Sequence, residues 1–145
     1  MKTKVKVEME EKRLFDILKL YIAKYPSQEV ALAKKESGSW KKYSIQKYIE
    51  ITNNISYALI KLGIKKDDKV GIICNNRPEW NMLDMAIMQV GAITVPIYPT
   101  ISKEDYHYII NDCEVKLIVL EGQSVLQKIE SVKNESFKFK SRKYS

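Results

Sequence analysis

Three short runs rich in β-branched residues recur at nearly even spacing, and this spacing constrains the fold more than any other feature. The runs are 70–74, 93–97 and 115–120, and a stretch with helical character follows each of them. Strands placed about 23 residues apart, with helices between them, are typical of a parallel sheet covered by helices. The sequence therefore predicts an α/β fold, a three-layer parallel-sheet unit of the βαβαβα kind.

The helices of this unit are predicted from their first residues and their apolar patterns. Pro78 is favoured in a first helical turn, and the residues after it are apolar nearly all round, which predicts a buried helix. Ser102 and Ser124 each open a capping-box-like pattern. We expect helices from about 102 to 112 and from about 124 to 132.

A helix, a hairpin and a second helix are predicted before the first of these strands. Apolar residues recur at helical spacing from Leu14 until Pro26 stops the run. Runs 30–35 and 40–43 flank a short turn and predict a small hairpin, after which Ser44 can cap a long helix that Gly63 closes. The predicted domains are a charged lead at 1–13, a folded part at 14–132, and a basic tail at 133–145 expected to be disordered.

Length, charge and cysteines narrow the class of protein. A chain of 145 residues that is 45% hydrophobic can close one core without disulfides. The net charge of +7 lies mainly in the two ends, so the chain lacks the clustered basic face of a nucleic-acid binder and we expect no such partner.

Cys74 and Cys113 form no metal or redox pair and are expected to be reduced and buried. Without a membrane-spanning or signal segment, a cytoplasmic protein is expected, with peripheral membrane contact left open.

Several nucleotide sites are excluded by their missing motifs. The turn after the first parallel strand reads Asn75-Asn76-Arg77-Pro78, without the glycines that let a dinucleotide pyrophosphate approach the backbone. The chain has five glycines and no glycine-rich phosphate loop. A receiver domain would need a cluster of acidic residues at the strand ends, where Cys74 and Ile97 stand instead. A flavodoxin-like nucleotide binder is disfavoured because no turn offers a phosphate or ring site.

Two strand exits hold the candidate ligand neighbours. Arg77 lies at the carboxyl end of a parallel strand and beside a helix amino terminus, where open α/β sheets bind ligands and anions. The alternative is an ion pair with Glu79 or another carboxylate. Tyr98, Pro99 and Thr100 occupy the corresponding exit of the next strand, where two prolines stiffen the backbone. Their alternative role is a rigid crossover into the following helix.

The remaining polar groups are predicted to be structural. His107, the only histidine, lies mid-helix without a nucleophile or carboxylate pattern to orient it, so a surface or half-buried position is expected. Asp67 and Asp68 are expected to be turn residues before a strand rather than a metal site. No catalytic residue and no metal ligand is predicted.

The ordered series NNRPEW, GAITVPIYPT and YIINDCEVKLIVLE resembles the amino-terminal region of AMP-forming acyl-CoA synthetases, most closely the long-chain fatty-acid–CoA ligases. The likeness runs from about Leu14 to Glu121 and includes the helix-hairpin-helix opening. It implies an enzyme that joins a fatty acid to ATP as an acyl-adenylate and passes the acyl group to coenzyme A, using Mg²⁺. It also implies that the chain is a fragment of the large amino-terminal domain of such an enzyme.

The groups that carry this family's chemistry have no matching position in the chain. They are a phosphate loop ending in Pro-Lys-Gly, the adenine and ribose contacts, and a lysine of a carboxyl-terminal domain. The chain alone is therefore expected to be inactive and to bind no cofactor, while ATP, Mg²⁺, coenzyme A and a fatty acid are implied for the full-length enzyme. Exposed apolar surface left by missing strands would favour self-association. The alternative function is a stand-alone interaction module that binds a partner or a membrane through its basic ends.

Overall fold

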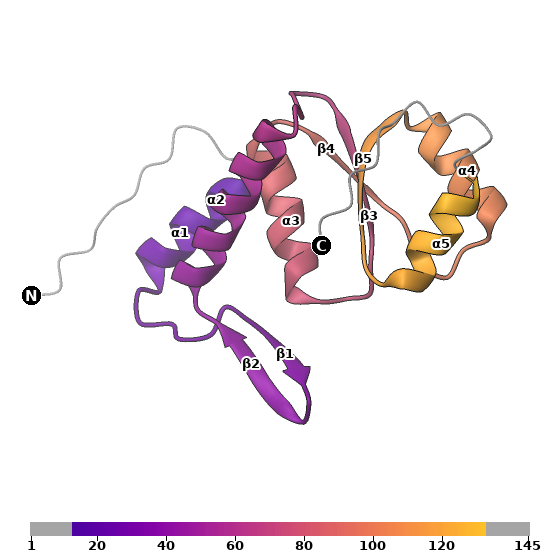
Figure 1. Ribbon diagram of the computed structural model, residues 1–145. Coiled ribbons are helices and arrows are strands. Elements are labelled where there is room, and N and C mark those ends of the chain that lie inside the picture. The colour runs from indigo at the N-terminus through magenta and orange to yellow at the C-terminus, as the bar shows by residue number, and fades with distance from the viewer. Residues whose placement is uncertain (1–12, 133–145) are drawn as a thin grey trace, which may run out of the picture. The chain divides into compact units, whose positions relative to one another are not determined.

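The computed structural model describes residues 13–132, which fall into two compact units (Figure 1). One unit ends at Ile51 and the other begins at Thr52, so the boundary lies inside a helix. The predicted lead 1–13, apart from Arg13, and the predicted tail 133–145 lie outside the described residues. Among residues 13–132, no helix combines the length and the apolar character needed to cross a membrane.

The first helix is shorter than its apolar pattern predicts. A 3₁₀ turn, η1 (Leu14–Asp16), precedes α1 (Ile17–Lys24), and Leu18 is the buried residue of α1. Leu14 is 62% exposed and Tyr25 is 47% exposed. Leu14 lies in the 3₁₀ turn and Tyr25 has a non-helical backbone, so neither stays in register with the α-helical stripe.

The predicted hairpin is confirmed, with its strands moved by up to two residues. β1 (Leu32–Glu36) pairs antiparallel with β2 (Ser39–Tyr43), and Ser37 and Gly38 form the turn between them. Both turn residues have positive φ, 49° for Ser37 and 84° for Gly38. Two successive left-handed residues match the twist of a two-residue hairpin, which explains the glycine.

The long helix α2 (Ile45–Lys61) begins and ends as the sequence predicts. The Ser44 hydroxyl accepts a hydrogen bond from the Lys47 backbone N–H at 3.2 Å. At the other end Gly63 has φ of 86°, and the Ile64 N–H donates to the Leu59 carbonyl at 3.0 Å. A left-handed glycine with this backward hydrogen bond is a common helix ending.

The second unit is built on the predicted parallel sheet. Its strands are β3 (Lys69–Ile73), β4 (Ile93–Pro96) and β5 (Val115–Leu120), in the spatial order β4-β3-β5. The helices between and after them are α3 (Pro78–Gln89), α4 (Lys103–Asp112) and α5 (Gln123–Val132). The α/β class and the three parallel strands are therefore confirmed.

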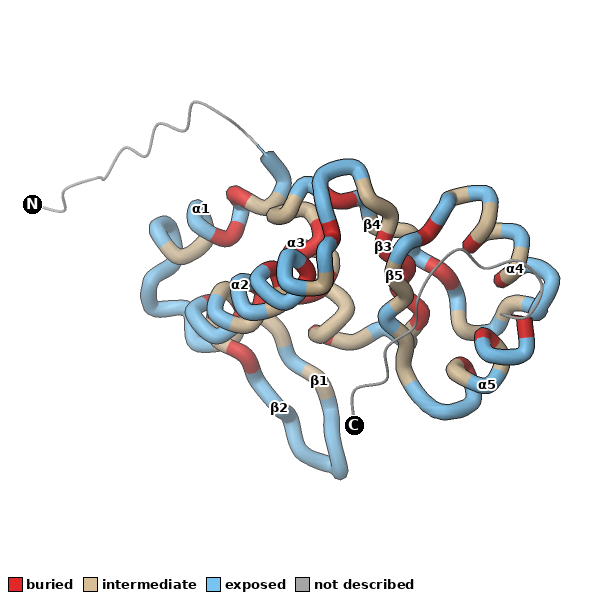
Figure 2. The backbone as a smooth tube through the Cα atoms, turned by 45° about the horizontal axis from the view of Figure 1, so that its top comes forward, coloured by how far each residue is buried: buried red, intermediate tan, exposed pale blue. Residues whose placement is uncertain are grey.

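Helices cover both faces of this sheet, α3 on one face and α4 with α5 on the other (Figure 1). The α3 face has a core of Leu59, Ile64, Val70, Ile72, Leu83, Ala86, Ile87 and Ala92. The opposite face has a core of Ile73, Ile97, Tyr106, Ile110, Val115, Val125 and Ile129. No residue of α3 is exposed, as its apolar pattern predicts, and Figure 2 shows the buried segments concentrated along the strands and the helix faces that meet them.

Two local predictions need correction, while a third is confirmed. Ser102 caps α4 through a reciprocal pair of bonds with Asp105, at 3.1 Å from the Asp105 N–H to the Ser102 hydroxyl. By contrast, α5 begins at Gln123, so Ser124 lies within the first turn instead of capping it. Cys74 and Cys113 are free thiols but only half-buried, because each lies just beyond a strand or helix end.

Candidate functional site

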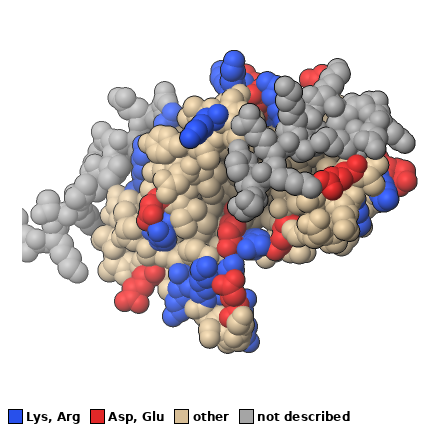
Figure 3. Space-filling view, viewed as in Figure 1, with Lys and Arg blue, Asp and Glu red and all other residues tan. Residues whose placement is uncertain are grey.

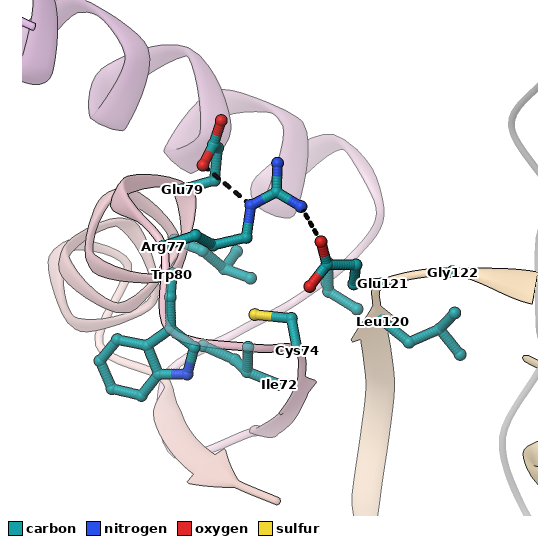
Figure 4. A pocket seen from close by; sticks show the side chains of 10 residues that line it. Ile72, Cys74, Arg77, Glu79, Trp80, Leu120, Glu121 and Gly122 are labelled. Carbon is teal, nitrogen blue, oxygen red and sulfur yellow. Dashed lines mark hydrogen bonds and ion pairs between the residues drawn. The ribbon is translucent and has the colours of Figure 1, made fainter. Parts of the chain in front are cut away.

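The candidate site lies at the carboxyl edge of the sheet, where β3 and β5 end side by side. β3 ends at Ile73 and β5 at Leu120, so Cys74 and Glu121 are the first residues beyond two neighbouring strands. Parallel strands open their carboxyl ends toward the loops that lead into helices, which is where ligands bind in open α/β sheets. The side chains that meet there are shown in Figure 4.

Arg77 lies at this edge, as predicted, and is held by two carboxylates. It is the residue before Pro78, with an extended backbone at φ −159° and ψ 157°. Its Nε donates to Glu79 Oε2 at 2.9 Å, and its Nη1 forms an ion pair with Glu121 Oε1 (Figure 4). The hydrogen bond to Glu79, followed by the negative charge of both carboxylates, raises the pKa of Arg77 above its usual range. The ion pair with Glu79, given above as the alternative to a ligand role, is thus present.

Glu121 is the residue of this edge that sequence reasoning missed. Besides Arg77 it contacts Asn75, whose backbone N–H donates to Oε2 at 3.0 Å and whose side-chain amide lies 3.4 Å from the same oxygen. One carboxylate therefore joins the end of β5 to the loop after β3. The available signal was its place directly after a strand, in the same position that Cys74 has after β3.

A hollow of about 320 Å³ opens beside this ion pair, and we call it the carboxyl-edge hollow. It is lined by Ile72, Cys74, Arg77, Glu79, Trp80, Leu83, Val119, Leu120, Glu121 and Gly122. Five of these residues are aliphatic or aromatic and form its wall, while the charged groups stand at one side (Figure 4). Burial raises the pKa of the Cys74 thiol, and the charge of Glu121 raises it further, so the thiol is protonated at neutral pH.

The charges of the carboxyl-edge hollow do not fit a nucleotide phosphate. Its single cation, Arg77, is bonded to both Glu79 and Glu121, which leaves the lining with a net negative charge. Phosphate sites in proteins use unpaired cations and converging backbone N–H groups instead. Among residues 13–132 there is also no group of three acidic, histidine or cysteine side chains arranged to hold a metal ion.

The second predicted strand exit lies apart from this hollow. Tyr98 is 79% exposed, and Thr100 is exposed as well, while Pro99 is half-buried. None of the three lines the carboxyl-edge hollow, because they follow β4, which pairs with β3 on the side away from β5. The Tyr98 carbonyl accepts a hydrogen bond from the Tyr106 hydroxyl at 3.1 Å, so this exit is fixed to α4. Whether either exit touches a ligand stays a prediction.

The groups predicted to be structural have the expected environments. His107 is half-buried on α4, with its Nε2 3.1 Å from the Asn111 side-chain amide. Asp68 is a turn residue whose carboxylate accepts hydrogen bonds from the Lys65 N–H at 2.8 Å and from Lys116 Nζ at 2.6 Å. Neither belongs to the carboxyl-edge hollow.

The segment shared with curated relatives covers most of this chain but only a small part of each relative. The chain is 39% identical over 106 residues to a long-chain-fatty-acid–CoA ligase, ACSBG2, of Xenopus laevis, which covers 73% of this chain and 14% of that protein. It is 36% identical over 107 residues to fatty acyl-CoA synthetase A of Dictyostelium discoideum, covering 74% of this chain and 16% of that protein. The chain thus spans about one seventh of the length of these relatives.

Solved structures share the fold, and a family pattern covers the chain. The N-terminal domain of FACL13 from Mycobacterium tuberculosis matches with a TM-score of 0.74 at 20% identity, over 87% of this chain and 31% of that one. The anthranilate CoA ligase AuaEII, in complex with anthranoyl-AMP, matches with a TM-score of 0.70 at 25% identity, over 83% of this chain and 22% of that one. The sequence pattern described as AMP-binding enzyme matches residues 19–142. The chain therefore belongs to the AMP-binding enzyme family, and its curated relatives there include long-chain fatty-acid–CoA ligases.

Proposed function

We propose that this chain is an amino-terminal part of a long-chain fatty-acid–CoA ligase, in which it frames the active site without carrying the catalytic groups. The observation that supports this most is the family match over residues 19–142, together with relatives named as ligases of long-chain fatty acids. The full-length enzyme would join a fatty acid to ATP, release pyrophosphate and transfer the acyl group to coenzyme A, with Mg²⁺. The contribution of this part would be the first three strands of the sheet and their helices.

The chain by itself would not form an acyl-adenylate. Adenylate formation needs cations and N–H donors that stabilise the charge developing on the phosphates. The cation at the carboxyl edge, Arg77, is already bonded to Glu79 and Glu121, and the described strand exits hold no glycine-rich turn. The remaining donors would come from other parts of a full-length ligase.

Pyrophosphate exchange tests the inactivity directly. Purified chain, supplied with palmitate, ATP and Mg²⁺, is expected to exchange labelled pyrophosphate into ATP no faster than a mock preparation from cells lacking the gene. Exchange that requires palmitate and rises in proportion to the chain concentration would contradict the proposal. Arg77→Ala serves as the matched variant, because activity of a contaminating ligase would be the same in both preparations.

A chimera tests the framing role. The matching 106-residue segment of the Xenopus ligase is replaced by the corresponding segment of this chain, which is 39% identical to it. We expect the chimera to fold and to form palmitoyl-CoA at a measurable rate, since the catalytic groups come from the rest of the ligase. A chimera that folds, as judged by its thermal transition, but forms no acyl-adenylate would count against the framing role.

We also propose that apolar surface on the outer strands makes the isolated chain associate with itself. Ile93 of β4 is 46% exposed and Val119 of β5 is 37% exposed. Large exposed apolar side chains on unpaired strand edges favour association. We expect the chain to bind the dye ANS and to show a concentration-dependent mass in sedimentation. A monomer at all concentrations without dye binding would argue against a part taken from a larger sheet.

A further inference from the structure

The two faces of the β1–β2 hairpin differ in charge balance and burial. Register pairs place Leu32 with Tyr43, Lys34 with Lys41 and Glu36 with Ser39 on one face, and Ala33 with Lys42 and Lys35 with Trp40 on the other. The first face is the inner one, since Tyr43 is buried and the Lys34 side chain is only 16% exposed. We call the second, which consists of Ala33, Lys35, Trp40 and Lys42, the outer hairpin face.

Charge on the inner face is partly compensated, because one carboxylate faces two lysines, whereas charge on the outer hairpin face is not compensated. Glu36 Oε1 lies 3.3 Å from Lys34 Nζ, and its Oε2 lies 3.8 Å from Lys41 Nζ. Glu36 is the only acidic residue in the two strands, and it points to the inner face. Lys35 and Lys42 are exposed, and within residues 13–132 neither takes part in an ion pair. Figure 3 shows basic side chains gathered over this hairpin, with acidic ones beside them.

Trp40 is 64% exposed; it lies opposite Lys35 and two positions before Lys42 on the same face. Lysines on an exposed strand are also a common protection against edge-to-edge association. That protection does not require a large aromatic side chain on the same face, and an exposed tryptophan works against it. An exposed tryptophan and uncompensated lysines on one face suit an anionic membrane surface. There, indole rings lie at the level of the headgroups, and lysines are attracted to the negatively charged lipid phosphates.

We propose that the outer hairpin face binds an anionic lipid bilayer, with Trp40 entering the headgroup region and Lys35 and Lys42 contacting lipid phosphates. The charge complementarity is supplied by the two uncompensated lysines, and the apolar contact by the indole. In a ligase this surface would bring the enzyme to the lipid phase in which long-chain fatty acids dissolve. That last purpose rests on the proposed function, whereas the binding itself does not.

Vesicle binding of the 145-residue chain, without ATP, coenzyme A or fatty acid, tests the proposal and is independent of ligase activity. Co-sedimentation compares vesicles of phosphatidylcholine with vesicles that contain 30% phosphatidylserine. We expect binding to the anionic vesicles only, and a decline as salt is raised, because ions screen exposed lysines. In a Trp80→Phe background, in which Trp40 is the sole tryptophan, the fluorescence should shift to shorter wavelength on binding.

Two double variants localise the contact. Lys35→Gln with Lys42→Gln is expected to lower the partition coefficient roughly 25-fold, at about fivefold for each lysine near an anionic surface. Lys65→Gln with Lys103→Gln changes the charge equally at exposed positions outside the hairpin and should have little effect. Trp40→Ala should weaken binding and abolish the fluorescence shift, while circular dichroism confirms that each variant folds.

Three results would overturn the proposal. Equal losses in both lysine double variants would mean that only net charge matters. A loss caused by deleting 133–145, but not by the hairpin variants, would transfer the binding to the basic tail. Binding of the chain to a single-stranded RNA oligonucleotide that depends on Trp40, Lys35 and Lys42, with no binding to vesicles, would assign the face to nucleic acid instead.

Discussion

The strands β3 and β5 are joined by a charged pair near each end, and the two ends differ in what surrounds that pair. At the amino end Lys116 Nζ lies 2.6 Å from Asp68 Oδ1; the lysine side chain is 57% exposed and that of Asp68 is 11% exposed. At the carboxyl end Arg77 and Glu121 are 30% and 33% exposed, and they border the carboxyl-edge hollow. The pair joins an exposed lysine to a turn carboxylate at one end, and it forms the rim of a hollow at the other.

This difference shows how a parallel sheet places a potential site at one edge only. At the amino end the chain arrives through short turns, and Asp68 closes its turn by accepting from the Lys65 N–H. At the carboxyl end the chain leaves into α3, whose first turn supplies Trp80, and the adjacent strand supplies Leu120. Apolar side chains thus line a hollow beside the ion pair at the carboxyl end.

The largest expected effect comes from a substitution in the buried part of β3, between the two charged pairs. Ile72 of β3 is 1% exposed and lies between them. Ile72→Ala should lower the free energy of unfolding by about 3 kcal/mol, through lost burial and the cavity that remains. Val119→Ala, at a side chain that is 37% exposed, is the control and should cost less than about 1 kcal/mol. Urea unfolding followed by circular dichroism measures both, and equal losses would contradict the assignment of Ile72 to the core of the α3 face.

Separate removal of one charge at each end sharpens the comparison. Glu121→Ala removes one of the two carboxylates bonded to Arg77 and the acceptor of the Asn75 N–H, and should lower the free energy of unfolding by about 1–2 kcal/mol. Lys116→Ala, at the exposed end, should cost less than about 1 kcal/mol, as is usual for surface ion pairs. The same urea titration compares them. A larger loss for Lys116→Ala would reverse the roles that we assign to the two ends.

The Asp68–Lys116 pair at the amino end should make the free energy of unfolding depend on pH. The hydrogen bond from Lys116 lowers the pKa of Asp68 below its ordinary value of 3.8. A lowered folded-state pKa adds stability above the unfolded value, and that stability is lost as pH falls through the folded-state pKa. We expect Asp68→Asn to be less stable than wild type at pH 7, by less than about 1 kcal/mol, with the gap shrinking below about pH 4.

The exposed turn residue Asp67 provides the control for this titration. Asp67→Asn removes the same charge one position away, and it reports what the loss of one negative charge does to the unfolding free energy over the same pH range. Thermal unfolding at intervals of half a pH unit is sufficient. If the stability difference between Asp68→Asn and wild type widened on acidification, the inferred direction of the Asp68 pKa shift would be wrong.

The smallest expected effect concerns the thiol at the carboxyl end. Burial raises the pKa of Cys74 most, the charge of Glu121 raises it further, and the charge of Arg77 lowers it. Glu121→Gln should therefore increase the rate of Cys74 alkylation by iodoacetamide at pH 8, by about two- to threefold, and Arg77→Gln should decrease it. Peptide mass spectrometry follows Cys74, with Cys113 as the internal reference. Faster alkylation in both variants would mean that access to the hollow, rather than charge, controls the rate.

Much of the fold could be predicted because its signals are local. The β-branched runs gave all three parallel strands to within a residue or two, and Ser102 and Gly63 mark helix ends through hydrogen bonds formed within a few residues. The error at Ser124 has the same origin, since a capping pattern shifted by one residue looks alike in sequence. The resemblance to acyl-CoA synthetases agrees with the family match.

The contact between Arg77 and Glu121 could not be predicted, because it depends on strand order. Periodicity indicates three strands but not that β5 pairs with β3 rather than with β4. The direct pairing of β5 with β3 brings residues 44 positions apart into contact at one edge. The carboxyl-edge hollow follows from the same order, so its lining could not be listed from sequence either.

The central position of β3 also has a consequence for synthesis. β3 is the first strand of the sheet to leave the ribosome, and both of its neighbours follow later in the chain. β4 can pair with it after about twenty more residues, but β5 requires some twenty beyond that, and each later partner closes a longer loop. Until Leu120 has emerged, one side of the middle strand has no partner. During this part of synthesis a chaperone would have the most to cover, namely the unpaired edge of β3 and its exposed apolar side chains.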